Sequence, residues 1–480
     1  MRRLACLLSV AVASGSLSAA AAQARSPLQI GAVVQELLDR SRVGTVVQAM
    51  TDSGLDGAAR VTLTWKRGQK DLDPGLLSDL QYAVQQAAAK GIEVYLTLYP
   101  AGANDTPRTI AARRTFAKWA AWVVARLPEV DHIIVGNEPN LNRFWLPQFG
   151  RGGKDVAAPA YVRLLARTYD AIKAVAPSAE VVGGTLAHAG TNRPGTFRDT
   201  QAPQRFLLDM GKAYREMGRK RPIMDAFAFH PYMEHAYLPP TYEHYSPRIM
   251  TIADYGRLVS VLRRAFDGTG QRGSKIAIVY AEFGVEARIP AALRPAYTGT
   301  EPATTRPVSE AVQGKYYAKA MQMAACQPTV RTFLLFRLID ETLRGGWQSG
   351  VYYANGSPKA SLPRVEAAAR RLQEQAPTGC RIVLAPRPRV SFFPARKPTA
   401  ASPVVRPISL LADADSVYEV RLTKGSSLVA AASGTAVAGV RKRIGLTEEP
   451  LPRGTYRITV RVTATDYKAN PFTVSRTFAF

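Results

Sequence analysis

The chain has 480 residues, and its 63 Lys and Arg against 37 Asp and Glu give a formal net charge of +26. Its hydrophobic content of 46% is enough for a real core and excludes an intrinsically disordered chain. The basic residues are scattered without a long run or a recognition module, which argues against dedicated nucleic-acid binding and favours acidic surroundings.

Residues 1–24 have the pattern of a secretory signal peptide. Arg2 and Arg3 precede the apolar stretch "LACLLSVAVASGSLSAAAA", and Ala22-Gln23-Ala24 fits an A-x-A cleavage site. An uncleaved membrane anchor is the alternative, but Gly and Ser dilute the apolar stretch. No later segment has the ~20 uninterrupted apolar residues of a membrane span. We therefore expect a secreted, extracellular monomer, with attachment to a cell wall as an option.

From residue 25 to residue 378, short apolar runs alternate with longer stretches of helical spacing. The runs are 28–34, 58–65, 92–99, 132–138, 179–186, 225–232, 274–284 and 330–340. The helical stretches are 43–50, 76–91, 108–127, 160–175, 204–218, 252–266, 309–325 and 364–375. Just before the third helical stretch, Thr106-Pro107 is typical of an N-cap followed by proline at the first helical position.

Continuously apolar strands that alternate with helices predict parallel crossover units, and eight of them close naturally into a (β/α)8 TIM barrel. A doubly wound open sheet is the competing fold, but no glycine-rich phosphate turn follows an early strand. We therefore expect an α/β barrel over 25–378.

The pattern changes after the barrel. Residues 381–407 contain six prolines, and 379–407 is predicted to be a proline-rich linker or a loosely paired edge. Residues 408–480 alternate short strands with turns, which predicts a small all-β sandwich. Its last strands resemble those of immunoglobulin-like or fibronectin-type modules.

Two cysteines remain after signal cleavage, Cys326 and Cys380, in a chain that we expect in an oxidising compartment. They form a possible disulfide, and two buried thiols are the alternative. No C-x-x-C and no histidine cluster has metal-ligand spacing, so we predict no metal and no cofactor.

Two apolar runs end on a glutamate. Glu138 ends the fourth run, in "HIIVGNEPN", and Glu282 lies at the end of the seventh, in "IVYAEFG". In a TIM barrel these strand ends meet at one mouth. Two carboxylates across a cleft are the minimum machinery for cleaving a glycosidic bond, because one donates a proton while the other attacks or stabilises positive charge.

"GNEPN" and "AEFG" resemble the signature segments of clan A retaining glycoside hydrolases, such as families 5 and 39. The resemblance implies that Glu138 is the acid/base and Glu282 the nucleophile. It also implies that Asn137 bonds the sugar 2-hydroxyl. In "FHPY", which matches the clan's His-x-Tyr, His230 would contact the acid/base and Tyr232 would orient the nucleophile.

The same resemblance implies that Arg60 supports the nucleophile and that Trp347 is an aromatic platform. Tyr99 and Trp65 are further candidates for stacking on sugar, and structural packing is the alternative for Tyr99, Trp65 and Trp347. Tyr99-Pro100 stands where many family 5 enzymes carry a histidine, whereas "NEPN" leans towards family 39, so the residues do not decide between the two families.

The expected activity is therefore hydrolysis of O-glycosidic bonds in a polysaccharide or oligosaccharide, with retention of configuration. The alternative is a non-catalytic carbohydrate-binding or cell-envelope protein on a barrel scaffold. The sugar and its linkage, endo or exo action, hydrolysis or transglycosylation, and the role of the β-sandwich are left open.

Overall fold

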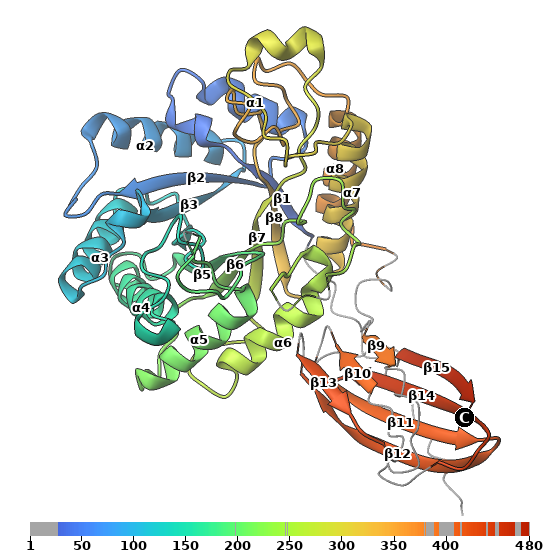
Figure 1. Cartoon of the computed structure of the whole chain (residues 1–480). Helices are drawn as coiled ribbons and strands as arrows, with labels where there is room; N and C mark the ends of the chain where they lie inside the picture. The colour runs from blue at the N-terminus through green and yellow to red at the C-terminus, as the bar shows by residue number, and fades with distance from the viewer. Residues whose placement is uncertain are drawn as a thin grey trace, which may run out of the picture.

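The computed structural model describes residues 27–196, 198–244, 246, 248–378, 380, 388–392, 408–412, 415–437, 440–446, 451–465 and 472–479. The predicted signal peptide, residues 1–24, lies outside this range, as does most of the predicted linker. Figure 1 shows two parts, a barrel with surrounding helices and a smaller β-structure that follows it.

Eight parallel strands close into one barrel in sequence order, which confirms the predicted fold. They are β1 (Gln29–Val33), β2 (Ala58–Trp65), β3 (Glu93–Pro100), β4 (His132–Val135), β5 (Glu180–Ala187), β6 (Ala226–His230), β7 (Ala277–Phe283) and β8 (Val330–Leu335). Pairing of β1 with β8, Gln29 opposite Thr332, closes the barrel. The strands are buried on both sides, which is why they read as continuous apolar runs.

Eight helices form the outer layer. They are α1 (Val43–Asp52), α2 (Pro74–Ala88), α3 (Ile110–Val124), α4 (Ala157–Val175), α5 (Pro203–Glu216), α6 (Tyr255–Phe266), α7 (Glu310–Cys326) and α8 (Leu362–Glu374). The main apolar core fills the space between this layer and the strands. A second, smaller cluster includes the barrel-strand residues Ala58, Tyr95, Ile134 and Val279.

The start of α3 corrects one sequence prediction. The predicted cap, Thr106, lies before the helix, where its hydroxyl donates to Ala103 O at 2.6 Å. Thr109 is the cap instead, and its side chain accepts from Ala112 N at 3.1 Å. Both threonines fit the N-cap preference, and a tertiary hydrogen bond from Leu146 N holds Thr106 outside the helix.

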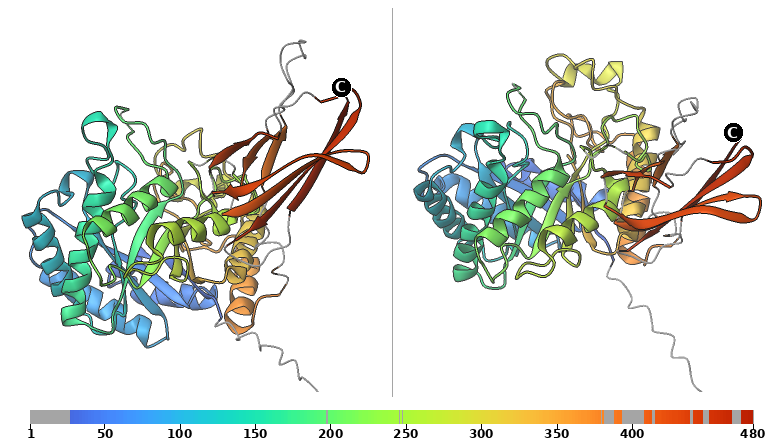
Figure 2. Two further views of the ribbon diagram at one scale, coloured as in Figure 1. Left: turned by 90° about the horizontal axis from the view of Figure 1, so that it is seen from below. Right: turned by 60° about the horizontal axis from the view of Figure 1, so that its bottom comes forward.

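The C-terminal part is a pair of antiparallel sheets around their own apolar core, in agreement with the predicted sandwich (Figure 2). One sheet has the order β13-β10-β9 and the other β12-β11-β14-β15. The strands are β9 (Arg389–Phe392), β10 (Ile408–Leu411), β11 (Ser416–Lys424), β12 (Ser427–Ala436), β13 (Arg441–Ile444), β14 (Thr455–Ala464) and β15 (Phe472–Ala479).

Strand β9 lies within the proline-rich stretch 379–407 and pairs with β10 at the edge of its sheet, which agrees with the loosely paired edge rather than with the linker. Its four residues are surrounded by prolines in the sequence, and Val390 and Phe392 pack against the sandwich core. The proline-rich stretch therefore carries a short edge strand, the position in a sheet where proline is tolerated. Arg263 of α6 also forms an ion pair with Asp415 just before β11, which joins the barrel to the sandwich.

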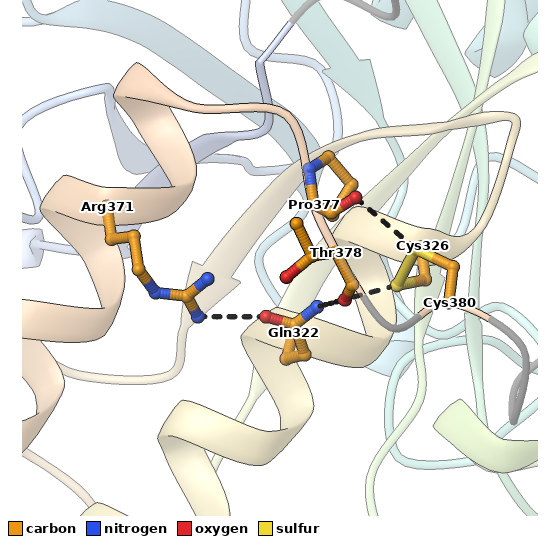
Figure 3. Close-up of a disulfide and its surroundings, with 6 residues drawn as sticks. All are labelled: Gln322, Cys326, Arg371, Pro377, Thr378 and Cys380. Atoms are coloured by element: carbon orange, nitrogen blue, oxygen red, sulfur yellow. Dashed lines mark hydrogen bonds between the residues drawn. A yellow bond between two sulfur atoms is a disulfide. The ribbon is translucent and has the colours of Figure 1, made fainter.

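Cys326 at the end of α7 is bonded to Cys380, 54 residues later in the chain (Figure 3). The bond encloses β8 and α8. Beside it, Gln322 donates to Thr378 O at 2.8 Å and accepts from Arg371 of α8 at 2.8 Å. Within the described residues, every helix is too short or too polar to cross a membrane.

Replacing both cysteines by serine should lower the free energy of unfolding by about 3–4 kcal/mol, because a crosslink over a loop of this length restricts the unfolded chain. Thermal and denaturant unfolding of C326S/C380S and of the reduced wild type measures this. Equal stability of the three proteins would show that the bond does not constrain the chain in solution.

Candidate active site

Two glutamates meet at the mouth of the barrel. Glu138 follows β4, and Glu282 lies one residue before the end of β7. One carboxylate oxygen of each, together with a ring nitrogen of His230 from β6, all lie within 4.8 Å of one another. The fold therefore brings together the two carboxylates that the sequence analysis selected.

Glu282 is held by a cation and a phenol. Arg60 of β2 donates from Nη1 to Glu282 Oε1 at 2.5 Å, and the Tyr232 hydroxyl donates to Oε2 at 3.0 Å. Arg60 is 2% exposed and Glu282 8%. Both carboxylate oxygens are thus fixed by donors, in the contacts that the family resemblance implies for Arg60 and Tyr232.

The surroundings of Glu282 favour its ionised form. Burial opposes ionisation and is the largest single influence, but the positive charges of His230 and Arg60 and two hydrogen bonds outweigh it, so that the pKa of Glu282 lies below its ordinary value. Burial, with the charge of Glu282, raises the pKa of Tyr232 well above its usual value. Tyr232 therefore stays a neutral donor.

Glu138 has a different environment. His230 Nδ1 lies 3.0 Å from Glu138 Oε1 and 3.5 Å from Glu282 Oε2, so the imidazole bridges the two carboxylates. The Glu138 side chain is 14% exposed and forms no ion pair with an arginine of the described chain. Asn137 accepts from Arg60 Nη2 at 3.1 Å through its side-chain oxygen, and it lines the cleft.

The backbone that presents Glu138 is unusual. Glu138 has φ 40° and Thr185, at the end of β5, has φ 50°, both in the left-handed region that non-glycine residues rarely adopt. The Glu138 N–H donates to Thr185 O at 2.9 Å. Gly136 has φ 99°, and a Cβ there would lie 2.8 Å from the Tyr161 ring. Strained backbone of this kind persists where the surrounding structure fixes it.

Two buried side chains fix this turn. The Tyr161 hydroxyl donates to Val135 O at 2.7 Å and accepts from Gly184 N at 2.9 Å, which ties β4 to β5. Asn140 accepts from Ala187 N at 2.9 Å and donates to Gln201 O at 3.0 Å. The last residue of "GNEPN" therefore anchors the loop, a role that the sequence analysis did not assign.

Glu138 and Glu282 both line a cleft of about 870 Å³. Of the predicted substrate-contacting residues, Tyr99 and Trp347 line it. The Trp347 ring packs against Tyr232 and Phe336, at centroid distances of 5.1 and 5.2 Å. Trp347 therefore presents a supported aromatic surface beside the residue that holds Glu282.

Trp65 does not reach the cleft, so the prediction that it contacts substrate is wrong. It is fully buried, packs edge-on against Phe116 of α3 at 5.4 Å, and donates to Gln69 O. Side chains alternate along a strand, and Trp65 is five residues from the inward-facing Arg60. It therefore points to the helices, whereas Thr62 and Thr64 line the cleft.

Several cleft residues were not predicted. Arg337 follows β8 with φ 78° and pairs with Glu341 at 2.5 Å. His188 follows β5, and burial, with the charges of His244 and His230, lowers its pKa to about 4. Its imidazole is therefore neutral at neutral pH. Arg143 follows β4 and carries no sequence signal beyond its closeness to Glu138.

Glu138, His230 and Glu282 also have the composition of a metal site. A cation bound there would face the guanidinium of Arg60, 2.5 Å from Glu282, and would compete with the hydrogen bonds that hold all three side chains. The fixed positive charge therefore favours acid–base and nucleophilic chemistry of the two carboxylates over metal binding.

No protein-family model and no curated protein matches the sequence. Among solved structures, GH5_18 from Streptomyces cattleya in complex with Manb1-4GlcNAc matches over 73% of this chain and 83% of its own, at 16% identity and a TM-score of 0.49. A glucosidase from Croceicoccus marinus matches over 88% of this chain and 94% of its own, at 11% identity and a TM-score of 0.46.

The match to Bacteroides uniformis beta-glucuronidase 2 covers 95% of this chain at 11% identity and a TM-score of 0.45. This chain spans less than half of that protein, 46% of its length. The solved structures named here are glycoside hydrolases, the class that the two glutamate motifs resemble. The sequence similarity to these structures is remote, so the chemistry of the site depends on this chain's own side chains.

Replacing Arg60 with methionine should raise the pKa of Glu282 by about 1–3, because the buried carboxylate loses its adjacent cation. The measurement is a 13C NMR titration of protein labelled at the glutamate carboxyls, with the Glu282 signal assigned by its absence in E282Q. R60K, which keeps the charge, should retain most of the lowering. An unchanged Glu282 titration in R60M would contradict the role of Arg60.

Proposed function

We propose that the chain hydrolyses O-glycosidic bonds in a polysaccharide or oligosaccharide by a retaining double displacement, with Glu282 as nucleophile and Glu138 as acid/base. The observation that carries the proposal is that the two carboxylate oxygens lie within 4.8 Å in unlike surroundings. Retaining enzymes hold their carboxyl groups about 5–5.5 Å apart, and inverting enzymes about 6.5–9.5 Å apart.

In the first step, an ionised Glu282 oxygen attacks the anomeric carbon, while Glu138 gives its proton to the leaving oxygen. Arg60 and Tyr232 keep Glu282 ionised and aligned through their hydrogen bonds. The bond to the leaving group breaks, and a glycosyl ester forms on Glu282.

In the second step, Glu138, now ionised, takes a proton from water, and the water oxygen displaces Glu282 from the sugar. His230 contacts both carboxylates, so it remains within reach of whichever one carries the negative charge. As the positive charge develops on the sugar ring, the neutral His188 adds no repulsion. Two displacements restore the original configuration.

The two glutamates should be distinguishable by azide rescue. E138A should lose about 10²–10⁴-fold in kcat/KM on substrates with poor leaving groups, and much less with activated ones. Azide should restore its turnover with a glycosyl azide of the substrate's configuration. E282A should be rescued with the opposite configuration, because azide then replaces the nucleophile.

A 2-fluoro glycoside should label Glu282, as read by peptide mass spectrometry. E341Q serves as the matched variant, since it removes another carboxylate of the same cleft, and it should lose far less than either glutamate variant. A label on any other residue would refute the assignment. Tight retention on glycans without turnover of any substrate would favour a binding protein instead.

Trp347 should act mainly in substrate binding. W347A should raise KM about ten-fold, the equivalent of about 1.4 kcal/mol, and W347F should lie between it and the wild type, because a smaller ring keeps part of the stacking surface. Initial rates on oligosaccharides separate the two constants. A loss in kcat alone would show that Trp347 instead supports Tyr232.

A further inference from the structure

The four-stranded sheet of the sandwich has one face in the apolar core and one face exposed. Along β11, buried Tyr418, Val420 and Leu422 alternate with exposed residues. The exposed face carries Arg421 on β11 and both Arg457 and Arg461 on β14. We call these residues and their outward-facing neighbours on the same sheet the outer sheet face.

The register places the three arginines in one patch. Arg421 lies opposite Thr459, the residue of β14 that stands midway between Arg457 and Arg461. Glu419 lies opposite Arg461. Outward residues on one strand are about 7 Å apart, so each step from Arg457 to Thr459 to Arg461 has this length. The guanidinium groups are therefore close enough to repel one another.

This positive charge is poorly compensated. Glu419 lies 4.0 Å from Arg461, with exposed fractions of 62% and 54%, so their pairing is weak. Within the part of the chain that the structure describes, Arg421 and Arg457 form no ion pair. From residue 379 onward the sequence has 16 Lys and Arg against six Asp and Glu, so the surroundings are basic as well.

The other side chains on the outer sheet face favour one kind of anion. They include hydroxyl groups, such as Thr459 and Ser475, which lie 2.9 Å apart across β14 and β15. The outward-facing positions of β11 and β14 carry no aromatic ring. Proteins that bind single-stranded nucleic acids without sequence preference stack bases on aromatic rings, whereas hydroxyls and guanidinium groups suit the hydroxyls and carboxylates of acidic sugars.

We propose that the outer sheet face binds an acidic polysaccharide, one whose sugars carry carboxylates. The sandwich then holds the chain on an anionic glycan, independently of the chemistry in the barrel. The cleft has a matching feature, because Arg143 lines it and has no carboxylate partner among the described residues. Arg60 and Arg337, also in the cleft, each pair with a glutamate.

Affinity gel electrophoresis of the full chain in polygalacturonate tests this proposal. R421Q/R457Q/R461Q should bind about ten-fold more weakly, since each exposed guanidinium–carboxylate contact adds a modest increment. The matched control is R114Q/R167Q/R364Q, which removes the same charge from exposed positions on α3, α4 and α8. The control should stay within about two-fold of the wild type.

A second variant changes affinity in the opposite direction. E419Q removes the acidic group from the patch and should tighten binding, with little risk to folding because Glu419 is exposed. Thermal unfolding of every variant shows whether the sandwich is intact. Added salt should weaken polygalacturonate binding, and an uncharged glucan gel should retard the wild type and R421Q/R457Q/R461Q equally, because the outer sheet face contributes nothing to it.

Three results would overturn the proposal. Equal losses in the two triple variants would show that net charge, and not this face, binds the polymer. Equal retention by the uncharged glucan would show that carboxylates are not recognised. Tighter binding of single-stranded DNA than of polygalacturonate at the same salt, lost in R421Q/R457Q/R461Q, would make nucleic acid the partner.

Discussion

The buried ion pair between Arg60 and Glu282 is the interaction on which the site depends. Arg60 also donates to Thr97 Oγ1 at 2.7 Å and to Ala281 O at 3.1 Å, so one guanidinium joins β2, β3 and β7. A buried charge pair contributes little net stability unless its remaining donors are satisfied. Here they are satisfied by groups that belong to the mouth of the barrel, so the barrel and the carboxylate hold each other in place.

The opposite carboxylate is positioned by the backbone. Glu138 sits in a left-handed conformation, and Tyr161 and Asn140 bond the ends of β4 and β5 around it. One glutamate is thus fixed through its side chain and the other through its main chain. The first is buried and keeps its charge, whereas the second retains contact with the cleft, as the proposed acid/base role requires of a group that gains and loses a proton.

The barrel could be predicted from the sequence because strands that are buried on both faces read as continuous apolar runs. Both glutamates could be predicted because each is a charged residue at the end of such a run. The contacts that hold Glu282 could be predicted only through the family resemblance, since Arg60 and Glu282 are distant in the chain. The prediction for Trp65 was wrong because it ignored the alternation of side chains along β2, which points Trp65 towards the helices. Arg337 and His188 have no linear signal, because loop conformation brings them into the cleft. The proline-rich composition around β9 left a linker and a paired edge both open, because the partner of this strand is 16 residues away or more.

The connection between the barrel and the sandwich affects how the two parts could act together. Arg263 of α6 pairs with Asp415, so the sandwich contacts the barrel there. The disulfide fixes Cys380, which precedes the sandwich, to the end of α7. A weak surface site increases the overall affinity for a polymer when it is linked to a second binding site. Once one site has bound, the other meets the polymer at a high local concentration instead of its bulk concentration. Under the proposed binding, an exposed patch of individually weak arginines would therefore be sufficient on a chain that also carries the barrel cleft. Strong binding at the sandwich would instead slow the movement of the cleft along a polymer.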